Sequence, residues 1–103
     1  MKIEAIRARI KAGRFSITDH ALTESFKDGV TITDILYALD HGKIIEEYRH
    51  RQRCLVYGKT SDKVSIHIVI DYSWEEEIDI VTVYRPDPRE WLNFQTRKKK
   101  GAK

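Results

Sequence analysis

The stretch VSIHIVIDY, residues 64–72, decides the fold of this chain because its apolar side chains recur at every second position. In an extended strand, alternate side chains point to opposite faces of the sheet. One face carries the apolar side chains of Val64, Ile66, Ile68 and Ile70. The stretch therefore predicts a strand with one face in the core, and it places His67 on the opposite face.

Three more segments have strand character, and they occupy the second half of the chain: residues 44–48, 54–59 and 78–85. The connections HRQR, TSDK and SWEEE are short and polar. Such connections suit antiparallel hairpins between consecutive strands. The second half thus predicts a four-stranded antiparallel β-meander.

The first half has helical spacing instead. Apolar residues at this spacing end at a glycine three times, at Gly13, Gly29 and Gly42. We expect the second helix to begin with Thr18 or Asp19 as its N-cap, and the third with the near capping box of residues 31–34. Three N-terminal helices are therefore predicted.

The chain then leaves its last strand through VYRPDPREW, residues 83–91. Proline fixes φ and removes a donor, so the strand is expected to stop near Arg85. Asp87 and Pro88 suit the start of a short C-terminal helix that lays Trp91 over the sheet or the first helices. The predicted fold class is α+β, with N-terminal helices packed on one face of the meander and the other face partly open.

The chain length limits the number of domains, and the charge distribution marks out a C-terminal tail. With 103 residues the chain has room for one core, expected over residues 1–96. Five of its 19 basic residues fall in residues 97–103, and the remainder carries 14 basic against 16 acidic residues. We expect this basic tail to be disordered, serving either as a solubilising end or as a phosphate contact. A second basic cluster lies at residues 49–53.

Several classes of function lack support in the sequence. The single cysteine, Cys54, cannot form an intramolecular disulfide, which fits the reducing cytoplasm. Charges interrupt residues 1–15 too often for a signal peptide or a membrane span. No glycine-rich phosphate loop occurs, and the histidines lack metal-ligand spacing, so no cofactor and no metal are expected. Any chemistry would be metal-free acid–base work.

His67 is the leading candidate for such chemistry, since an imidazole with a pKa near about 6.5 can transfer protons. The alternative is a half-buried structural histidine. If Tyr72 pairs with Glu77 across the last hairpin, then Thr82 lies opposite His67 and Tyr84 lies on the same face. A slip of one residue would instead place Tyr84 under the helices.

Other polar residues are candidates for a site with His67. His20 stands in the first turn of the second helix, where the helix dipole favours a neutral imidazole, or it bonds only locally. Tyr84 can donate a proton, and Arg85 beside it can grip a phosphate, although both residue types are also common on strands and surfaces. Lys59 and Arg53, at the two ends of a strand, are further candidate phosphate ligands.

Five stretches together resemble a known family: HAL, DILYALDHGKIIEEY, RCLVYGKT, SIHIVIDY and IVTVYRPDPREW. Their order and spacing are similar to the domain of unknown function 4258 family, from about residue 15 to residue 91. The resemblance implies a relation to the RelE/MqsR-like ribonuclease toxins and a cognate antitoxin-like protein partner. The residues that match its pattern are His20, Ala21, Gly42, Glu46, Tyr48, His67, Thr82, Tyr84, Pro86 and Trp91.

Two hypotheses follow. In the first, the protein is a metal-independent endoribonuclease of toxin–antitoxin type, with His67 or His20 as base and Tyr84 or the other histidine as acid. Arg85, Lys59 or Arg53 would then stabilise charge on the phosphate of the RNA. In the second, the open sheet face is a non-catalytic module that binds RNA or a protein. Glu24, which stands where the family usually has arginine, favours the second.

Overall fold

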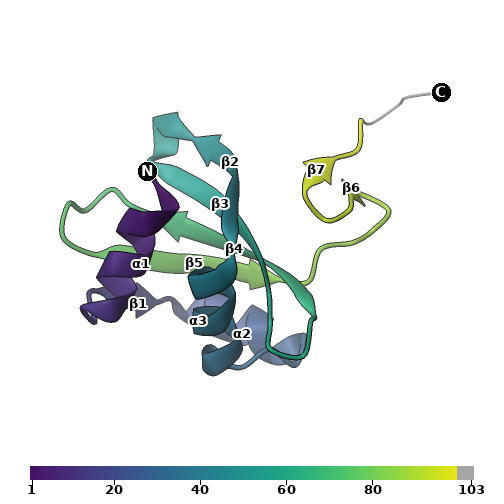
Figure 1. Ribbon diagram of the computed structural model, residues 1–103, viewed down its shortest axis with the longest axis horizontal. Coiled ribbons are helices and arrows are strands. Elements are labelled where there is room, and N and C mark those ends of the chain that lie inside the picture. The colour runs from purple at the N-terminus through teal and green to yellow at the C-terminus, as the bar shows by residue number, and fades with distance from the viewer. Residues whose placement is uncertain (100–103) are drawn as a thin grey trace.

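A computed structural model describes residues 1–99 of the chain (Figure 1). One short strand lies between the first and second of three helices, and six further strands follow the third helix. The helices are α1 (Ile3–Lys11), α2 (Asp19–Lys27) and α3 (Ile32–His41), with a 3₁₀ turn η1 (Arg49–Arg51). The strands are β1 (Phe15–Ile17), β2 (Lys43–Tyr48), β3 (Arg53–Lys59), β4 (Ser65–Asp71), β5 (Ile78–Tyr84), β6 (Trp91–Leu92) and β7 (Thr96–Arg97).

The core lies between the helices and one face of the sheet, as the sequence predicts. Ile66, Ile68 and Ile70 of β4 are fully buried there. Figure 1 shows the three helices gathered on one side of the sheet, away from the yellow C-terminal segment. Thr18 caps α2, because its hydroxyl accepts the amide of Ala21 at 3.1 Å. The mixed α+β class is therefore confirmed.

The sheet has five strands within the described residues, in the order β1-β5-β4-β3-β2, so the prediction of a four-stranded meander is wrong at one edge. β1 pairs in parallel with β5, with Phe15 opposite Ile78 and Ile17 opposite Ile80. A strand of three residues is too short to show an alternating pattern, which is why the sequence does not predict it.

The chain end forms a hairpin, β6–β7, where the sequence predicts a short helix. The amides of Glu90 and Trp91 do bond to the Asp87 carbonyl, but this single turn does not continue. Asn93 and Phe94 have φ of 51° and 61°, the sign that both central residues of a type I′ hairpin turn require. The predicted C-terminal helix is therefore wrong.

This C-terminal hairpin also includes Arg97, the first residue of the expected basic tail. Arg97 pairs with Trp91 across the two strands. Lys98 continues from it, with its amide bonded to the Glu90 carbonyl at 2.9 Å, whereas residues 100–103 of the predicted tail lie outside the described part of the chain. No helix within residues 1–99 is long and apolar enough to cross a membrane.

The register of β4 and β5 differs from the predicted one by one residue next to the loop and by two residues beyond a bulge. Ile70 lies opposite Ile80, and Val69 lies opposite Thr82, so Val81 is an extra residue that forms a β-bulge. Beyond the bulge Tyr84, not Thr82, is opposite His67. The predicted pairing is wrong by two positions, and an even shift keeps Tyr84 on the same face as His67.

Candidate functional site

The candidate site lies on the second face of the sheet, opposite the helices. Here the strand register brings side chains of β2, β3, β4 and β5 into one surface, part of which the C-terminal hairpin covers. The residues of this face that matter below are Glu46, Tyr48, Arg53, Tyr57, His67, Thr82 and Tyr84. The sequence predicts a partly open face; the part that carries His67 is closed, because His67 is fully buried.

His67 bonds through both ring nitrogens. Its Nε2 lies 2.6 Å from the carbonyl oxygen of Phe94, which can only accept a hydrogen bond, so Nε2 carries the proton. Its Nδ1 lies 3.0 Å from the hydroxyl of Tyr84, which can then donate to it. These two contacts hold a neutral imidazole and tie β4 to both β5 and the C-terminal hairpin.

Three aromatic rings surround the same imidazole. The ring centroid of Trp91 is 4.4 Å away, that of Tyr84 5.2 Å and that of Tyr57 6.2 Å, each in an edge-to-face arrangement. Trp91 is itself only 5% exposed. Trp91 therefore covers His67, which agrees with the prediction that this tryptophan lies over the sheet.

Burial shifts the pKa of both partners away from physiological pH. Desolvation lowers the pKa of His67, with the Phe94 hydrogen bond acting in the opposite direction. Burial also raises the pKa of Tyr84 to about 12. At neutral pH the pair consists of a neutral imidazole and a neutral phenol, in direct contact.

A charged network holds the C-terminal hairpin to β2. The Nε of Arg97 donates to Glu46 Oε2 at 2.9 Å, and the guanidinium lies 4.6 Å from the centre of the Trp91 ring. The hydroxyl of Tyr48 donates to the other oxygen of Glu46. Burial and this carboxylate raise the pKa of Tyr48. Glu46 thus joins a strand tyrosine to the arginine that lies over Trp91.

Next to this network the second face opens into a cationic groove of about 550 Å³. Its lining residues are Glu47, Tyr48, Arg49, His50, Arg51, Arg53, Val69 and Thr82. Arg53 pairs with Asp71 at 2.8 Å. Burial acts to raise the pKa of the Asp71 carboxyl, but the hydrogen bonds from Ser73 and Arg53 outweigh it and leave this pKa lowered. Arg49 and Arg51 form no ion pair with any residue in the described part of the chain.

The structure brings together some predicted site residues and separates others. His67 and Tyr84 are bonded, and Arg53 and Thr82 line one groove beside them. His20 is exposed in the first turn of α2. The amide of Arg85 bonds to Asp28 Oδ2 at 3.0 Å, which turns this residue toward the end of α2. Lys59 lines a different pocket at the other end of β3.

Sequence reasoning missed the roles of Phe94, Tyr57 and Arg97. Tyr57 could have been found, because it occupies the same alternating face of β3 as Arg53. Phe94 acts through its backbone carbonyl, which any residue supplies, so its identity gives no signal. Arg97 begins a run of basic residues in which no single position stands out.

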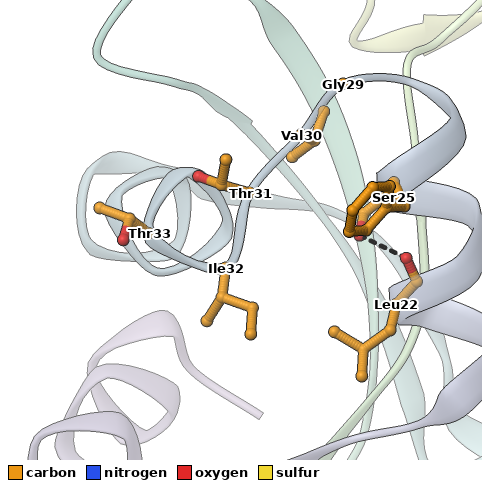
Figure 2. Close-up of a pocket in the computed structure, with 8 residues that line it drawn as sticks. Leu22, Ser25, Gly29, Val30, Thr31, Ile32 and Thr33 are labelled. Carbon is orange, nitrogen blue, oxygen red and sulfur yellow. Dashed lines mark hydrogen bonds between the residues drawn. The ribbon is translucent and has the colours of Figure 1, made fainter.

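A second concavity, of about 480 Å³, lies between α2 and α3 and is apolar (Figure 2). Figure 2 shows Leu22, Val30 and Ile32 around it, with the Ser25 hydroxyl bonded to the Leu22 carbonyl at 3.0 Å. None of its lining residues is ionisable. Within residues 1–99, no three His, Cys, Asp or Glu side chains lie together as metal ligands would.

The chain belongs to the family of a domain of unknown function, DUF4258, whose sequence profile matches residues 17–85. The match includes Arg53, His67 and Tyr84, and it ends before the C-terminal hairpin that packs on His67. No curated protein and no solved structure matches the chain.

Replacing Trp91 tests whether the hairpin holds the sheet together. We expect Trp91→Ala to lower the free energy of unfolding by about 3–5 kcal/mol, because the indole is nearly buried and packs against His67. Leu92→Ala, at the next position of β6 but 56% exposed, is the matched control and should change little. If urea unfolding shows that the two variants lose equal free energy of unfolding, the packing of Trp91 on His67 does not stabilise the fold.

His67 also makes stability depend on pH. Its pKa is lowered in the folded state, so between this value and the ordinary value of about 6.5 the unfolded chain binds more protons. The contribution of the neutral His67 to the stability of the fold is therefore complete above the ordinary pKa, and it is lost as the pH falls through and below that value. Measured from pH 7.5 to pH 5, the free energy of unfolding should decline less steeply in His67→Gln than in the unmodified protein.

The exposed His50 supplies the control for this measurement. His50→Gln removes an imidazole from the surface and should leave the steep decline in place. If both variants keep the slope of the unmodified protein, His67 is not the group that titrates.

Proposed function

We propose that this chain binds single-stranded RNA on the second face of its sheet. The observation that carries the proposal is the cationic groove, in which Arg49, Arg51 and Arg53 gather around a cavity of about 550 Å³. Arginine presents a planar fork of donors that fits two phosphate oxygens at once. Since Arg49 and Arg51 have no acidic partner among residues 1–99, their donors are available to a ligand.

The groove also supplies a surface for bases. Tyr48 and Val69 line it beside the arginines, and Tyr48 is half-buried with its hydroxyl fixed on Glu46. An aromatic ring that is held in place stacks on a base with little loss of side-chain entropy, and such stacking tolerates any sequence. Phosphate ligands beside an aromatic ring are the combination that single-stranded nucleic-acid sites use.

Positive charge continues from the groove onto the C-terminal hairpin. Arg97, Lys98 and Lys99 line a smaller cavity of about 360 Å³ there, together with Arg89 and Glu90. Arg89 is paired with Asp87 at 2.8 Å, and Arg97 with Glu46 at 2.9 Å, so two lysines against the one carboxylate of Glu90 leave the cavity with a net positive charge. The hairpin thus extends the same cationic surface rather than interrupting it.

A second candidate function is metal-independent RNA cleavage, as in the RelE/MqsR-like ribonuclease toxins. The observation in its favour is the direct hydrogen bond of 3.0 Å between His67 and Tyr84, on the same face as the groove. In such a reaction the 2′-hydroxyl attacks the adjacent phosphate, a base takes its proton and an acid protonates the leaving 5′-oxygen. Trp91 and the Phe94 carbonyl would have to leave His67 first, since they pack on its ring and occupy its Nε2.

Either function suits a cytoplasmic protein with RNA as its ligand. An antitoxin-like protein partner would act most simply by covering the cationic groove, with acidic side chains in place of phosphates. Such a partner would compete with RNA for Arg49 and Arg51. This competition distinguishes it from a partner that binds the apolar concavity between α2 and α3.

The double variant Arg49→Ala/Arg51→Ala tests the RNA-binding proposal. Its affinity for a fluorescent 12-nucleotide oligouridylate should fall, and the dependence of log affinity on log salt should become shallower by about 0.7 for each phosphate that the variant no longer binds. Lys2→Ala/Lys11→Ala, which removes two exposed charges near α1, is the control and should not alter that slope. An unchanged affinity in the arginine variant would contradict the proposal.

Cleavage is tested by Tyr84→Phe, which removes only the hydroxyl that faces His67. If the pair is catalytic, RNA cleavage should fall at least about tenfold, while the free energy of unfolding falls by about 1–3 kcal/mol because His67 Nδ1 is left buried without a partner. Tyr57→Phe is the matched control, because it removes a hydroxyl from another tyrosine beside His67. Intact RNA with the unmodified protein, or full cleavage by Tyr84→Phe, would rule out this role.

A further inference from the structure

A second cationic pocket lies at the opposite end of β3 from the groove. Its volume is about 500 Å³. Its lining includes Tyr37, His41, Lys43, Lys59, Lys63 and Gln95. The lysines come from three different segments, β2, β3 and the turn between β3 and β4. Charge therefore converges here from separate parts of the fold rather than from one run of sequence.

The three lysines are available to a ligand. Lys43, Lys59 and Lys63 are all exposed, and none forms an ion pair with another of the residues described. The turn that carries Lys63 is held by hydrogen bonds: its amide bonds to the Thr60 carbonyl at 2.9 Å, and the Thr60 amide to the Val64 carbonyl at 2.9 Å. The acidic residue in this turn, Asp62, does not line the pocket.

The end of α3 forms the aromatic wall of this lysine pocket. Tyr37 and His41 stack with ring centroids 4.2 Å apart, and Tyr37 is 41% exposed. Their distance from β3 is set by Gly58, where an added Cβ would lie within clashing distance of the Ala38 carbonyl oxygen. A strand residue with any side chain would push α3 away from β3, so glycine keeps this wall next to Lys59.

The C-terminal end of a helix normally repels an anion, because its last carbonyls carry partial negative charge. Here the guanidinium of Arg7 offsets that charge. Its Nε donates to the Leu39 carbonyl at 3.2 Å, and its Nη2 to the Gly42 carbonyl at 2.6 Å. The helix end that lies beside the lysines is therefore already neutralised by a side chain from α1.

We propose that the lysine pocket binds one nucleotide of the same RNA strand, its phosphate on the lysines and its base on Tyr37. This inference rests on the proposed RNA binding and assigns that function a second, separate contact. Arg53 and Lys59 stand at the two ends of β3, six residues apart, which corresponds to about 20 Å. A strand of several nucleotides spans that distance, and the cationic hairpin adjoins its path through Gln95, which lines the pocket.

The experiment measures fluorescence anisotropy of the 12-nucleotide oligouridylate over a range of salt concentrations. Lys59→Gln/Lys63→Gln should weaken binding and reduce the salt slope by up to about 1.4, or 0.7 for each phosphate contact. Tyr37→Ala should weaken binding at least about fivefold and leave the salt slope unchanged, since stacking involves no counterion. Lys2→Gln/Lys11→Gln is the charge-matched control.

The outcomes separate this inference from the proposal on which it rests. If Arg49→Ala/Arg51→Ala weakens binding but the lysine variant matches its control, RNA binds in the groove alone and the second contact is wrong. If neither variant weakens binding, both proposals fail. If the lysine variant responds and Tyr37→Ala does not, the pocket holds a phosphate without the base, which overturns the nucleotide assignment.

Each substituted side chain lies on the exposed surface, so we expect every variant to keep its fold. Thermal unfolding checks this. A second probe decides whether the ligand is single-stranded. A 12-base-pair RNA duplex has its bases stacked within the helix, and it should bind more weakly than the oligouridylate to the unmodified protein. Equal or tighter binding of the duplex would overturn the role of Tyr37.

Discussion

The second face of this protein depends on one buried imidazole. His67 has no exposed surface, and it bonds to Tyr84 on the neighbouring strand and to the Phe94 carbonyl on the C-terminal hairpin. A buried polar group without a partner costs more than its hydrogen bond contributes, so both contacts must form together. The hairpin is held over the sheet in this way, and its cations are positioned by the same histidine that the sequence marks as a candidate catalyst.

The bulge at Val81 makes this arrangement possible. The extra residue restores Tyr84 to the face of His67 after the loop has displaced the register by one position. Thr18 supports the bulge from the neighbouring edge, since its amide bonds to the Ile80 carbonyl at 3.0 Å and its hydroxyl donates to the Val81 carbonyl at 3.2 Å. Thr18, which caps α2, therefore also supplies hydrogen-bond donors to two carbonyls at the bulge.

The sequence predicts features with a strong local cause and fails where the cause is distant. The burial of Ile66, Ile68 and Ile70 follows from alternation alone. The bulge does not, because Val81 is as apolar as the core residues Ile80 and Val83 near it. β1 is too short to show a period, and it forms only because β5 offers it an edge. At the site, His67, Tyr84, Arg53 and Thr82 were predicted, whereas the hairpin that buries His67 depends on two positive φ angles in Asn93 and Phe94.

We expect RNA to bind along the second face and the adjoining end of α3, away from the apolar concavity between α2 and α3. Amide chemical shifts of isotope-labelled protein, recorded while an oligouridylate is added, test this most directly because every element reports at once. We predict that the largest changes fall in residues 49–53, 59–63 and 96–99 and at Tyr37 and His41 at the end of α3, with α1 and α2 nearly unaffected. Changes confined to α2 and α3 around the apolar concavity, or no changes at all, would contradict this placement of the RNA.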